Sequence, residues 1–138
     1  MNSAIPSVGD GLSVGMDLVE IPRFRRLVNR WRDRFLSRVF TDMELALAGG
    51  RVESLAARFA AKEAFAKALG LGLAGFGWRD VEVTASHRGK PELRLHNKAA
   101  KLADDAGFDQ FLVSLTHTAS LAAAVVIARK AGVTEVSH

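Results

Sequence analysis

The stretch from Arg58 to Gly70 has the hydrophobic pattern of a buried helix. It contains no β-branched residue, and Gly70 stands where a helix is expected to stop. At about 100° per residue, one arc of this helix carries large apolar side chains, and the opposite arc carries small ones. The small residues are Ala57, Ala60, Ala61, Ala64 and Ala68. A helix without a polar face belongs in the interior, and we expect it to run roughly from Val52 to Leu69.

Hydrophobic positions that alternate with others indicate strands elsewhere. In the first of these, Leu12–Ile21, alternation places Leu12, Val14, Met16 and Leu18 on one face. Further strands are expected over Asp80–Ala85, Glu92–Leu95, Phe111–Thr118 and Leu121–Ala128, the last two as a hairpin. Helices are expected from Pro22, from a capping box formed by Thr41 and Glu44 up to Gly49, and over Asn97–Ala106.

The order of these elements, β-α-α-α-β-β-α-β-β, predicts an α+β fold with helices packed against a mostly antiparallel sheet. The length of 138 residues suits one domain, which we expect over residues 12–130. Residues 1–11 are expected to be a flexible leader and residues 131–138 a tail.

The composition narrows the choice of partner and compartment. There is no cysteine, which excludes disulfides and thiolate metal sites and fits a reducing compartment such as the cytoplasm. The N-terminal stretch has neither a basic region nor a long apolar run, so we expect no signal peptide and no membrane association. The formal net charge of +4 favours an anionic partner: a phosphate, a nucleic acid or an acidic protein.

Arginines gather on the helix that follows the first strand. Between Arg23 and Arg38 there are seven arginines and one acid. The seven are Arg23, Arg25, Arg26, Arg30, Arg32, Arg34 and Arg38. Ordinary solvated surfaces intersperse both signs of charge, so this imbalance favours a docking surface for an anion over a simple solvated face.

Five charged residues lie where the pattern is otherwise apolar. Asp17 interrupts a strand, and Arg58, Lys62, Glu63 and Lys67 lie on the buried helix. Buried charges must be paired or must line a pocket. Two carboxylates with no Cys or His beside them suit Mg²⁺, and lysines nearby could hold phosphate oxygens. The pattern alone leaves open structural roles, in which the acids are hydrogen-bonded and the helix charges form i,i+4 pairs.

Three sequence blocks resemble one protein family. They are GMDLVEIPRF (Gly15–Phe24), RFAAKEAFAKALG (Arg58–Gly70) and SLTHT (Ser114–Thr118), and a GKP turn lies between the last two. The blocks are similar to those of the holo-acyl-carrier-protein synthase family, the small stand-alone class of 4'-phosphopantetheinyl transferases. Met16 within the strand triplet and Phe59 at the aromatic position of the helix signature are compatible with that family. The resemblance spans about residues 12–128 and implies the corresponding fold.

The resemblance implies transfer of 4'-phosphopantetheine from coenzyme A to a serine of apo-acyl carrier protein, with release of adenosine 3',5'-bisphosphate. It implies that Asp17 and Glu63 bind Mg²⁺ and that Asp17, Glu63 and Lys67 form the catalytic set. Lys62 and Lys67 would neutralise phosphate oxygens in the transition state. Glu63 or a metal-bound water would deprotonate the serine.

Further roles are implied for substrate and partner binding. Gly89, Lys90 and Pro91 would lie near the adenosine and its 3'-phosphate, with His117 closing the nucleotide site and Arg58 beside it. Arg23, Arg26 and Arg30 would dock the acidic carrier protein. The family also implies a homotrimer with active sites shared between subunits, in which the alanine-rich helix face would be a packing surface.

A non-enzymatic nucleic-acid-binding domain is the alternative, and it rests on the positive charge and the arginine-rich helix. Single-strand binders carry exposed aromatic residues among their cations. Here the aromatic residues near the arginines fall on the apolar stripe of the helix. We therefore expect coenzyme A and a carrier protein as partners, and no nucleic acid.

Overall fold

The computed structural model of the chain describes residues 11–72 and 75–130. The expected tail and residues 1–10 of the expected leader lie outside this part. The described elements are β1 (Leu12–Glu20), α1 (Ile21–Val39), α2 (Asp42–Ala48), α3 (Val52–Ala68), η3 (Trp78–Asp80), β2 (Val81–Ala85), β3 (Pro91–Leu95), α4 (Asn97–Asp105), β4 (Gln110–His117) and β5 (Leu121–Arg129). Their order confirms the predicted succession of strands and helices, with boundaries that move by one or two residues.

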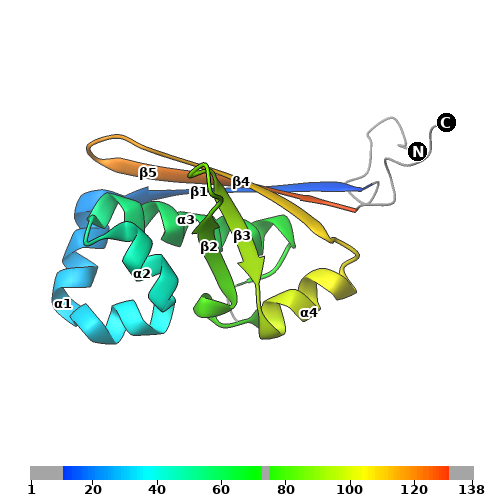
Figure 1. Ribbon diagram of the computed structural model, residues 1–138, viewed down its shortest axis with the longest axis horizontal. Helices are drawn as coiled ribbons and strands as arrows, with labels where there is room; N and C mark the ends of the chain where they lie inside the picture. The colour runs from blue at the N-terminus through cyan, green and yellow to red at the C-terminus, as the bar shows by residue number, and fades with distance from the viewer. Residues whose placement is uncertain (1–10, 73–74, 131–138) are drawn as a thin grey trace.

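An antiparallel sheet forms one layer of the molecule, in the strand order β1-β5-β4 (Figure 1). Strand β5 pairs with both neighbours, so that Asp17 on β1 lies opposite Ala124. The predicted hairpin of the last two strands is confirmed, with His117 opposite Ala122 at its closed end. Strands β2 and β3 form a separate two-stranded antiparallel sheet. The expected mostly antiparallel α+β architecture is therefore present.

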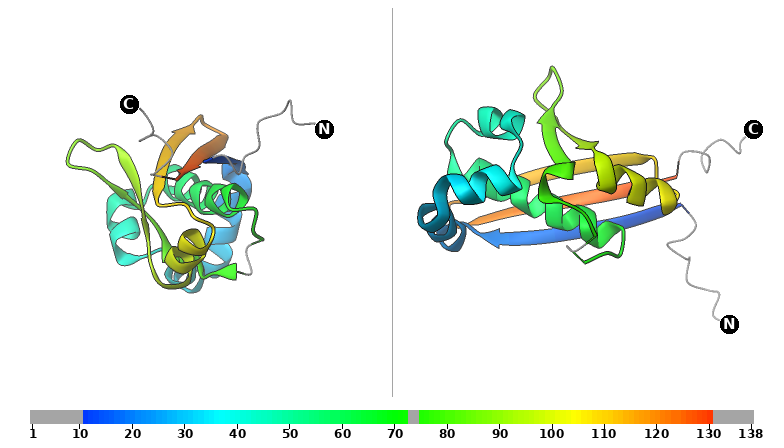
Figure 2. Two further views of the ribbon diagram at one scale, coloured as in Figure 1. Left: turned by 90° about the vertical axis from the view of Figure 1, so that its right-hand side faces the viewer. Right: turned by 90° about the horizontal axis from the view of Figure 1, so that it is seen from below.

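The long central helix α3 lies across the inner face of the larger sheet (Figure 2). Eleven of its 17 residues are buried, as its pattern predicts. Four of the five alanines of its small-residue face, Ala60, Ala61, Ala64 and Ala68, belong to the core that the helix forms with the sheet. This corrects the expectation that the alanine-rich face packs against another subunit. Small side chains are needed inside the chain itself, because they let the helix backbone approach the strands closely.

The first two helices cover one end of α3, and α4 lies near the other (Figure 2). Helix α1 contacts α3 through aromatic rings: the Phe59 ring centroid is 5.4 Å from that of Phe24 and 6.1 Å from that of Phe35. The capping box of α2 is formed as predicted, with Thr41 and Glu44 bonding each other's backbone N–H. Helix α1 is broken at Arg32, whose φ of 42° is not helical. The ring contacts of Phe59 hold α1 against α3.

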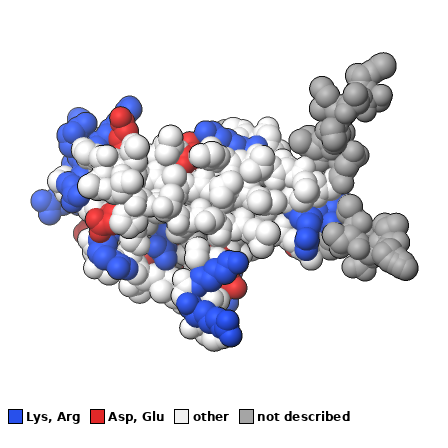
Figure 3. Space-filling view, turned by 90° about the horizontal axis from the view of Figure 1, so that it is seen from above, with Lys and Arg blue, Asp and Glu red and all other residues white. Residues whose placement is uncertain are grey.

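The outer face of the larger sheet is apolar, and none of the described helices or strands covers it. Val14 and Leu18 on β1 are 62% and 59% exposed, and Leu112 on β4 is 55% exposed. Figure 3 shows this face as a broad area nearly free of charge, with Lys and Arg side chains around its margins. Within the described residues, no helix is long and apolar enough to cross a membrane.

Candidate active site

The first half of the candidate site forms where β1 passes over α3. The Lys67 Nζ atom donates hydrogen bonds to the Asp17 Oδ1 atom at 2.9 Å and to the Met16 carbonyl oxygen at 3.1 Å. The Asp17 side chain is 14% exposed and the Lys67 side chain is 57% exposed. Asp17 therefore points into the fold from the strand, and Lys67 reaches it from the solvent side of the helix.

Glu63 joins this pair from one turn earlier on α3. Burial, together with hydrogen bonding to Asp17 and the negative charge of Asp17, raises the pKa of Glu63 to about 7, while Lys67 opposes the shift. The predicted convergence of Asp17 and Glu63 is thus present, with a lysine beside the two acids. Within residues 11–72 and 75–130, no group of three or more His, Cys, Asp or Glu side chains could hold a metal ion. Any cation held here would take at most two carboxylates from the described residues.

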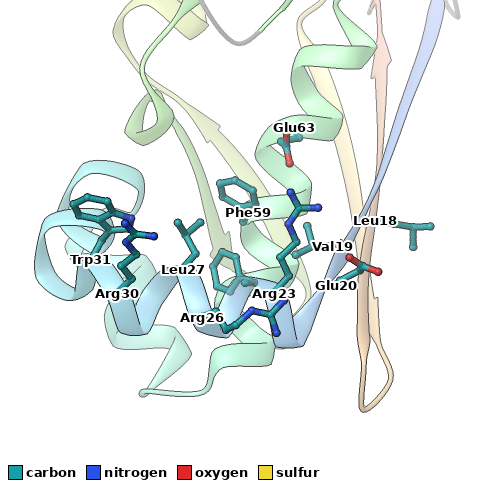
Figure 4. Close-up of a pocket in the computed structure, with 11 residues that line it drawn as sticks. Leu18, Val19, Glu20, Arg23, Arg26, Leu27, Arg30, Trp31, Phe59 and Glu63 are labelled. Atoms are coloured by element: carbon teal, nitrogen blue, oxygen red, sulfur yellow. The ribbon is translucent and has the colours of Figure 1, made fainter.

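A groove of about 1020 Å³ extends from Glu63 along the side of α1. Its apolar lining includes Phe24, Leu27 and Phe59. The three arginines expected to dock a partner, Arg23, Arg26 and Arg30, all line it. In Figure 4 the Arg23 side chain extends along the groove in the direction of Glu63. The groove therefore connects the acidic centre with the cationic surface of the first helix.

A second hollow, of about 340 Å³, lies on another side of α3. Arg58 and His117 both line it, together with Arg51 and Ser54. The Arg58 guanidinium is nearly buried and donates to the Val83 carbonyl oxygen at 3.2 Å and to Ser54 Oγ at 2.6 Å. Arg58 and Glu63 are five residues apart, which separates them by about 140° around a helix. The structure brings Arg58 and His117 together, and it keeps both away from the groove at Glu63.

The predicted GKP turn forms the tip of the β2–β3 hairpin. Gly89 has a φ of 84°, which a residue with a Cβ rarely adopts, and the turn is closed by the Ser86 N–H bonding the Lys90 carbonyl oxygen at 2.8 Å. Lys90 and Pro91 line a further hollow against β4 and β5, in which neither Asp17 nor Glu63 takes part. The residues expected near the adenosine end of coenzyme A thus occupy places separate from the two acids.

The structure corrects the role predicted for Lys62. Its side chain is 0% exposed, and its Nζ atom is 2.8 Å from Glu44 Oε1 in a fully buried ion pair. Burial lowers the pKa of Lys62, and the Glu44 charge works against that shift. An ammonium enclosed in this way does not reach a phosphate in solvent, so the expected contact between Lys62 and coenzyme A is wrong. The sequence did not distinguish it from Lys67, which lies on the same helix and is exposed.

Sequence reasoning also missed the second role of Glu44. The sequence pattern, Thr41 followed three residues later by Glu44, is a helix-start motif and carries no information on burial. In the structure Glu44 is fully buried and its Oε2 atom accepts a hydrogen bond from the Val83 N–H at 2.8 Å. No local pattern points to this contact, because Val83 is 39 residues away.

Comparisons with known proteins agree on one family. The sequence profile of the 4'-phosphopantetheinyl transferase superfamily matches residues 13–126. The holo-[acyl-carrier-protein] synthase of Geobacter sulfurreducens is 49% identical over 117 residues, which cover 82% of this chain and 93% of the relative. That of Herpetosiphon aurantiacus is 46% identical over 123 residues, which cover 84% and 97%. The crystal structure of the Helicobacter pylori holo-[acyl-carrier-protein] synthase in complex with coenzyme A is similar with a TM-score of 0.77 and 30% identity, covering 83% of this chain and 98% of that one.

Proposed function

Because this chain belongs to the 4'-phosphopantetheinyl transferase superfamily, as one of its holo-acyl-carrier-protein synthases, we propose that it transfers 4'-phosphopantetheine from coenzyme A to a serine of an acidic apo-acyl carrier protein. The second product is adenosine 3',5'-bisphosphate, and the reaction depends on Mg²⁺. The observation that carries the proposal is the meeting of Asp17, Glu63 and Lys67 at the inner end of the arginine-lined groove. The proposed place of action is the cytoplasm.

The donor set at this centre suits Mg²⁺. This ion is usually bound through one or two carboxylates, with substrate phosphates and waters as the remaining ligands. Asp17 and Glu63 supply two adjacent carboxylates, and burial, with the hydrogen bond to Asp17 and its charge, raises the pKa of Glu63. Asp17 and Glu63 would hold the ion. When bound, it would neutralise charge on the diphosphate of coenzyme A.

The residues of this chain then act on the two reactants. The serine oxygen of the carrier forms a bond to the phosphorus that bears the pantetheine arm, and the bond from that phosphorus to the bridging oxygen of the diphosphate breaks. The bridging oxygen and its electron pair leave with adenosine 3',5'-bisphosphate, and the proton of the serine passes to the Glu63 carboxylate. The exposed ammonium of Lys67 offsets negative charge on the transferred phosphoryl group.

A homotrimer would complete the site. Coenzyme A is long, and the residues assigned to its adenosine end, Arg58, His117 and the Gly89–Pro91 turn, lie apart from Asp17 and Glu63 in one chain. A neighbouring subunit could place its adenosine-binding residues beside these acids. The uncovered apolar sheet face, with Val14, Leu18 and Leu112 exposed, supports such an assembly, because faces of this kind usually mark protein interfaces.

The carrier protein would dock on α1. Acyl carrier proteins are acidic, and the exposed Arg23, Arg26 and Arg30 line the groove that leads to Glu63. Charge complementarity accelerates encounter and orients the partner. Because exposed charges are screened over about 8–10 Å at ordinary salt concentrations, the transfer rate should fall as salt is added.

Incubation of the chain with coenzyme A, Mg²⁺ and an apo-acyl carrier protein tests the proposal. We expect the carrier to gain the mass of one phosphopantetheinyl group on its serine, and a carrier with that serine replaced by alanine to gain none. Unchanged carrier mass, together with tight binding of the chain to random oligonucleotides, would instead support a nucleic-acid-binding domain.

A further inference from the structure

A buried network surrounds the residue that directly precedes Glu63. The Lys62 Nζ atom is 2.8 Å from Glu44 Oε1 and 3.0 Å from the Trp78 carbonyl oxygen, and it also donates to the Val81 carbonyl oxygen. An ammonium group has three N–H donors. Each of the three therefore has its own acceptor, and the acceptors come from α2, η3 and β2.

Both carboxylate oxygens of Glu44 also accept hydrogen bonds. Its Oε1 atom also accepts from the Thr41 N–H at 3.0 Å, and its Oε2 atom accepts from the Val83 N–H at 2.8 Å. Both side chains of the pair are 0% exposed. The pair thus links the start of α2, the middle of α3 and two backbone positions of β2 through directional bonds.

A pair of this kind is a poor way to gain stability. Removing two charges from water costs about as much as their attraction returns, and apolar replacements of similar volume are often as stable. The bonds instead fix the orientation of α3, because rotation or sliding of this helix would break several of them at once. Glu63 lies one residue on, about 100° around the helix, facing Asp17.

We propose that the Lys62–Glu44 pair is a positioning device for the reaction: it sets the rotation of α3 so that Glu63 meets Asp17. This role rests on the proposed function. It differs from direct substrate binding, because Lys62 has no exposed surface and lines neither the Glu63 groove nor the Arg58 hollow. Lys62 and Glu44 are accordingly positioning residues and not catalytic ones.

The double variant Lys62→Met with Glu44→Gln tests the role, since it removes both charges together and leaves neither uncompensated. Misplacing a catalytic group by about 1 Å can cost about 100-fold in rate. We expect kcat to fall at least about 10-fold while KM for coenzyme A stays within about threefold and the melting temperature stays near that of the wild type. The Mg²⁺ concentration for half-maximal rate should rise, because the two carboxylates no longer converge.

A matched control is Lys101→Met with Asp105→Asn, which removes the same kind of pair, 3.3 Å apart, from the exposed surface of α4. It should leave kcat, KM and the Mg²⁺ requirement unchanged. A folded Lys62→Met/Glu44→Gln variant with wild-type kcat overturns the proposal and leaves a purely structural pair. A KM for coenzyme A that rises with unchanged kcat also overturns it, in favour of direct contact with substrate.

The milder variant Glu44→Asp covers the case in which the double variant does not fold. It keeps the negative charge beside Lys62 but shortens the side chain by one methylene, so the bonds to Lys62 and Val83 no longer fit together, and we expect an intermediate loss of kcat, about threefold or more, with unchanged KM for coenzyme A. An unchanged kcat in this variant overturns the positioning role. The wild-type chain in the same assay separates the proposed function from the positioning role. A wild type that does not modify the carrier overturns both, whereas an active wild type with an equally active variant overturns only the positioning role.

Discussion

Gly15 and Ala64 meet backbone to backbone: a Cβ atom on Gly15 would lie 1.9 Å from the Ala64 carbonyl oxygen and 2.6 Å from the Ala68 nitrogen. Strand β1 therefore touches α3 at a point where no side chain fits. Asp17 lies two residues further along the same face of the strand, and Glu63 adjoins Ala64 on the helix. The close approach of the two backbones is what brings the two acids together.

Gly15→Ala should therefore damage both stability and activity. The added methyl group would force β1 away from α3, and overpacking of this kind costs about 1–3 kcal/mol. We expect a loss of this size in the free energy of urea unfolding, together with a fall in transfer rate. Gly72→Ala is the control, because an added Cβ at Gly72 meets nothing within 4 Å. Equal stability of the two variants would show that the contact can relax.

Asp17→Asn and Glu63→Gln should each abolish transfer while the chain stays folded. Each change removes one of the two negative charges that would hold Mg²⁺. In the wild type, Mg²⁺ should raise the melting temperature, because an ion bound by these two carboxylates of the folded chain stabilises it, and the chelator EDTA should reverse this. Neither variant should respond to Mg²⁺. Exposed Glu92→Gln serves as the control and should respond like the wild type. Aggregation of both variants would instead indicate structural carboxylates.

Arg23→Glu should weaken binding of the carrier protein far more than binding of coenzyme A. The residue lines the groove on α1, and charge reversal there would repel an acidic partner. We expect KM for the carrier to rise about 10-fold or more in steady-state assays at low salt, with KM for coenzyme A nearly unchanged. Arg25→Glu makes the same charge change on the same helix, at an exposed residue that does not line the groove, and should have a smaller effect. Equal rises in both Michaelis constants would contradict the docking assignment.

Val14→Glu should dissociate the proposed trimer. Val14 is 62% exposed on the outer sheet face, so a charge there should be tolerated by the fold and not by an apolar interface. Analytical ultracentrifugation should give a trimer for the wild type and a monomer for the variant, with transfer activity lost and circular dichroism unchanged. Ala106→Glu, at an exposed position after α4, should remain trimeric and active. A monomeric, active wild type would refute the shared site.

Acid should destabilise the fold partly through Glu82. Burial works to raise the pKa of Glu82, but hydrogen bonds from Thr41 and His96 outweigh it and hold the pKa below its usual value of 4.5. A depressed carboxyl pKa stabilises the fold above the unfolded value, and this contribution is lost as pH falls below about 4.5. The free energy of unfolding should therefore fall less steeply between about pH 5 and pH 3 in Glu82→Gln than in the wild type. The Glu92→Gln variant, on the neighbouring strand, should follow the wild type; a Glu82→Gln curve that does the same would contradict this assignment.

The local sequence pattern was sufficient to predict the helices and strands and to identify the family. Alternation along β1, the capping box at Thr41 and the apolar run of α3 each predicted an element that the structure contains. Such signals depend on residues within a few positions of one another, and they survive any change in how the elements later pack. The blocks around Asp17 and Glu63 also carried the resemblance that the comparisons confirm.

Lys62 and Glu63 show which features of the site only the folded molecule decides. They are adjacent charged residues on one buried helix, and the sequence allowed each of them to be either a buried paired charge or a residue that lines a pocket. Packing separates them, because about 100° of helix rotation turns Lys62 toward Glu44 and β2 and turns Glu63 toward Asp17 and β1. Whether a buried charge is enclosed or reactive depends on what distant segments place beside it, and those contacts, over 18 residues for Lys62 and 46 for Glu63, exist only after the chain has folded.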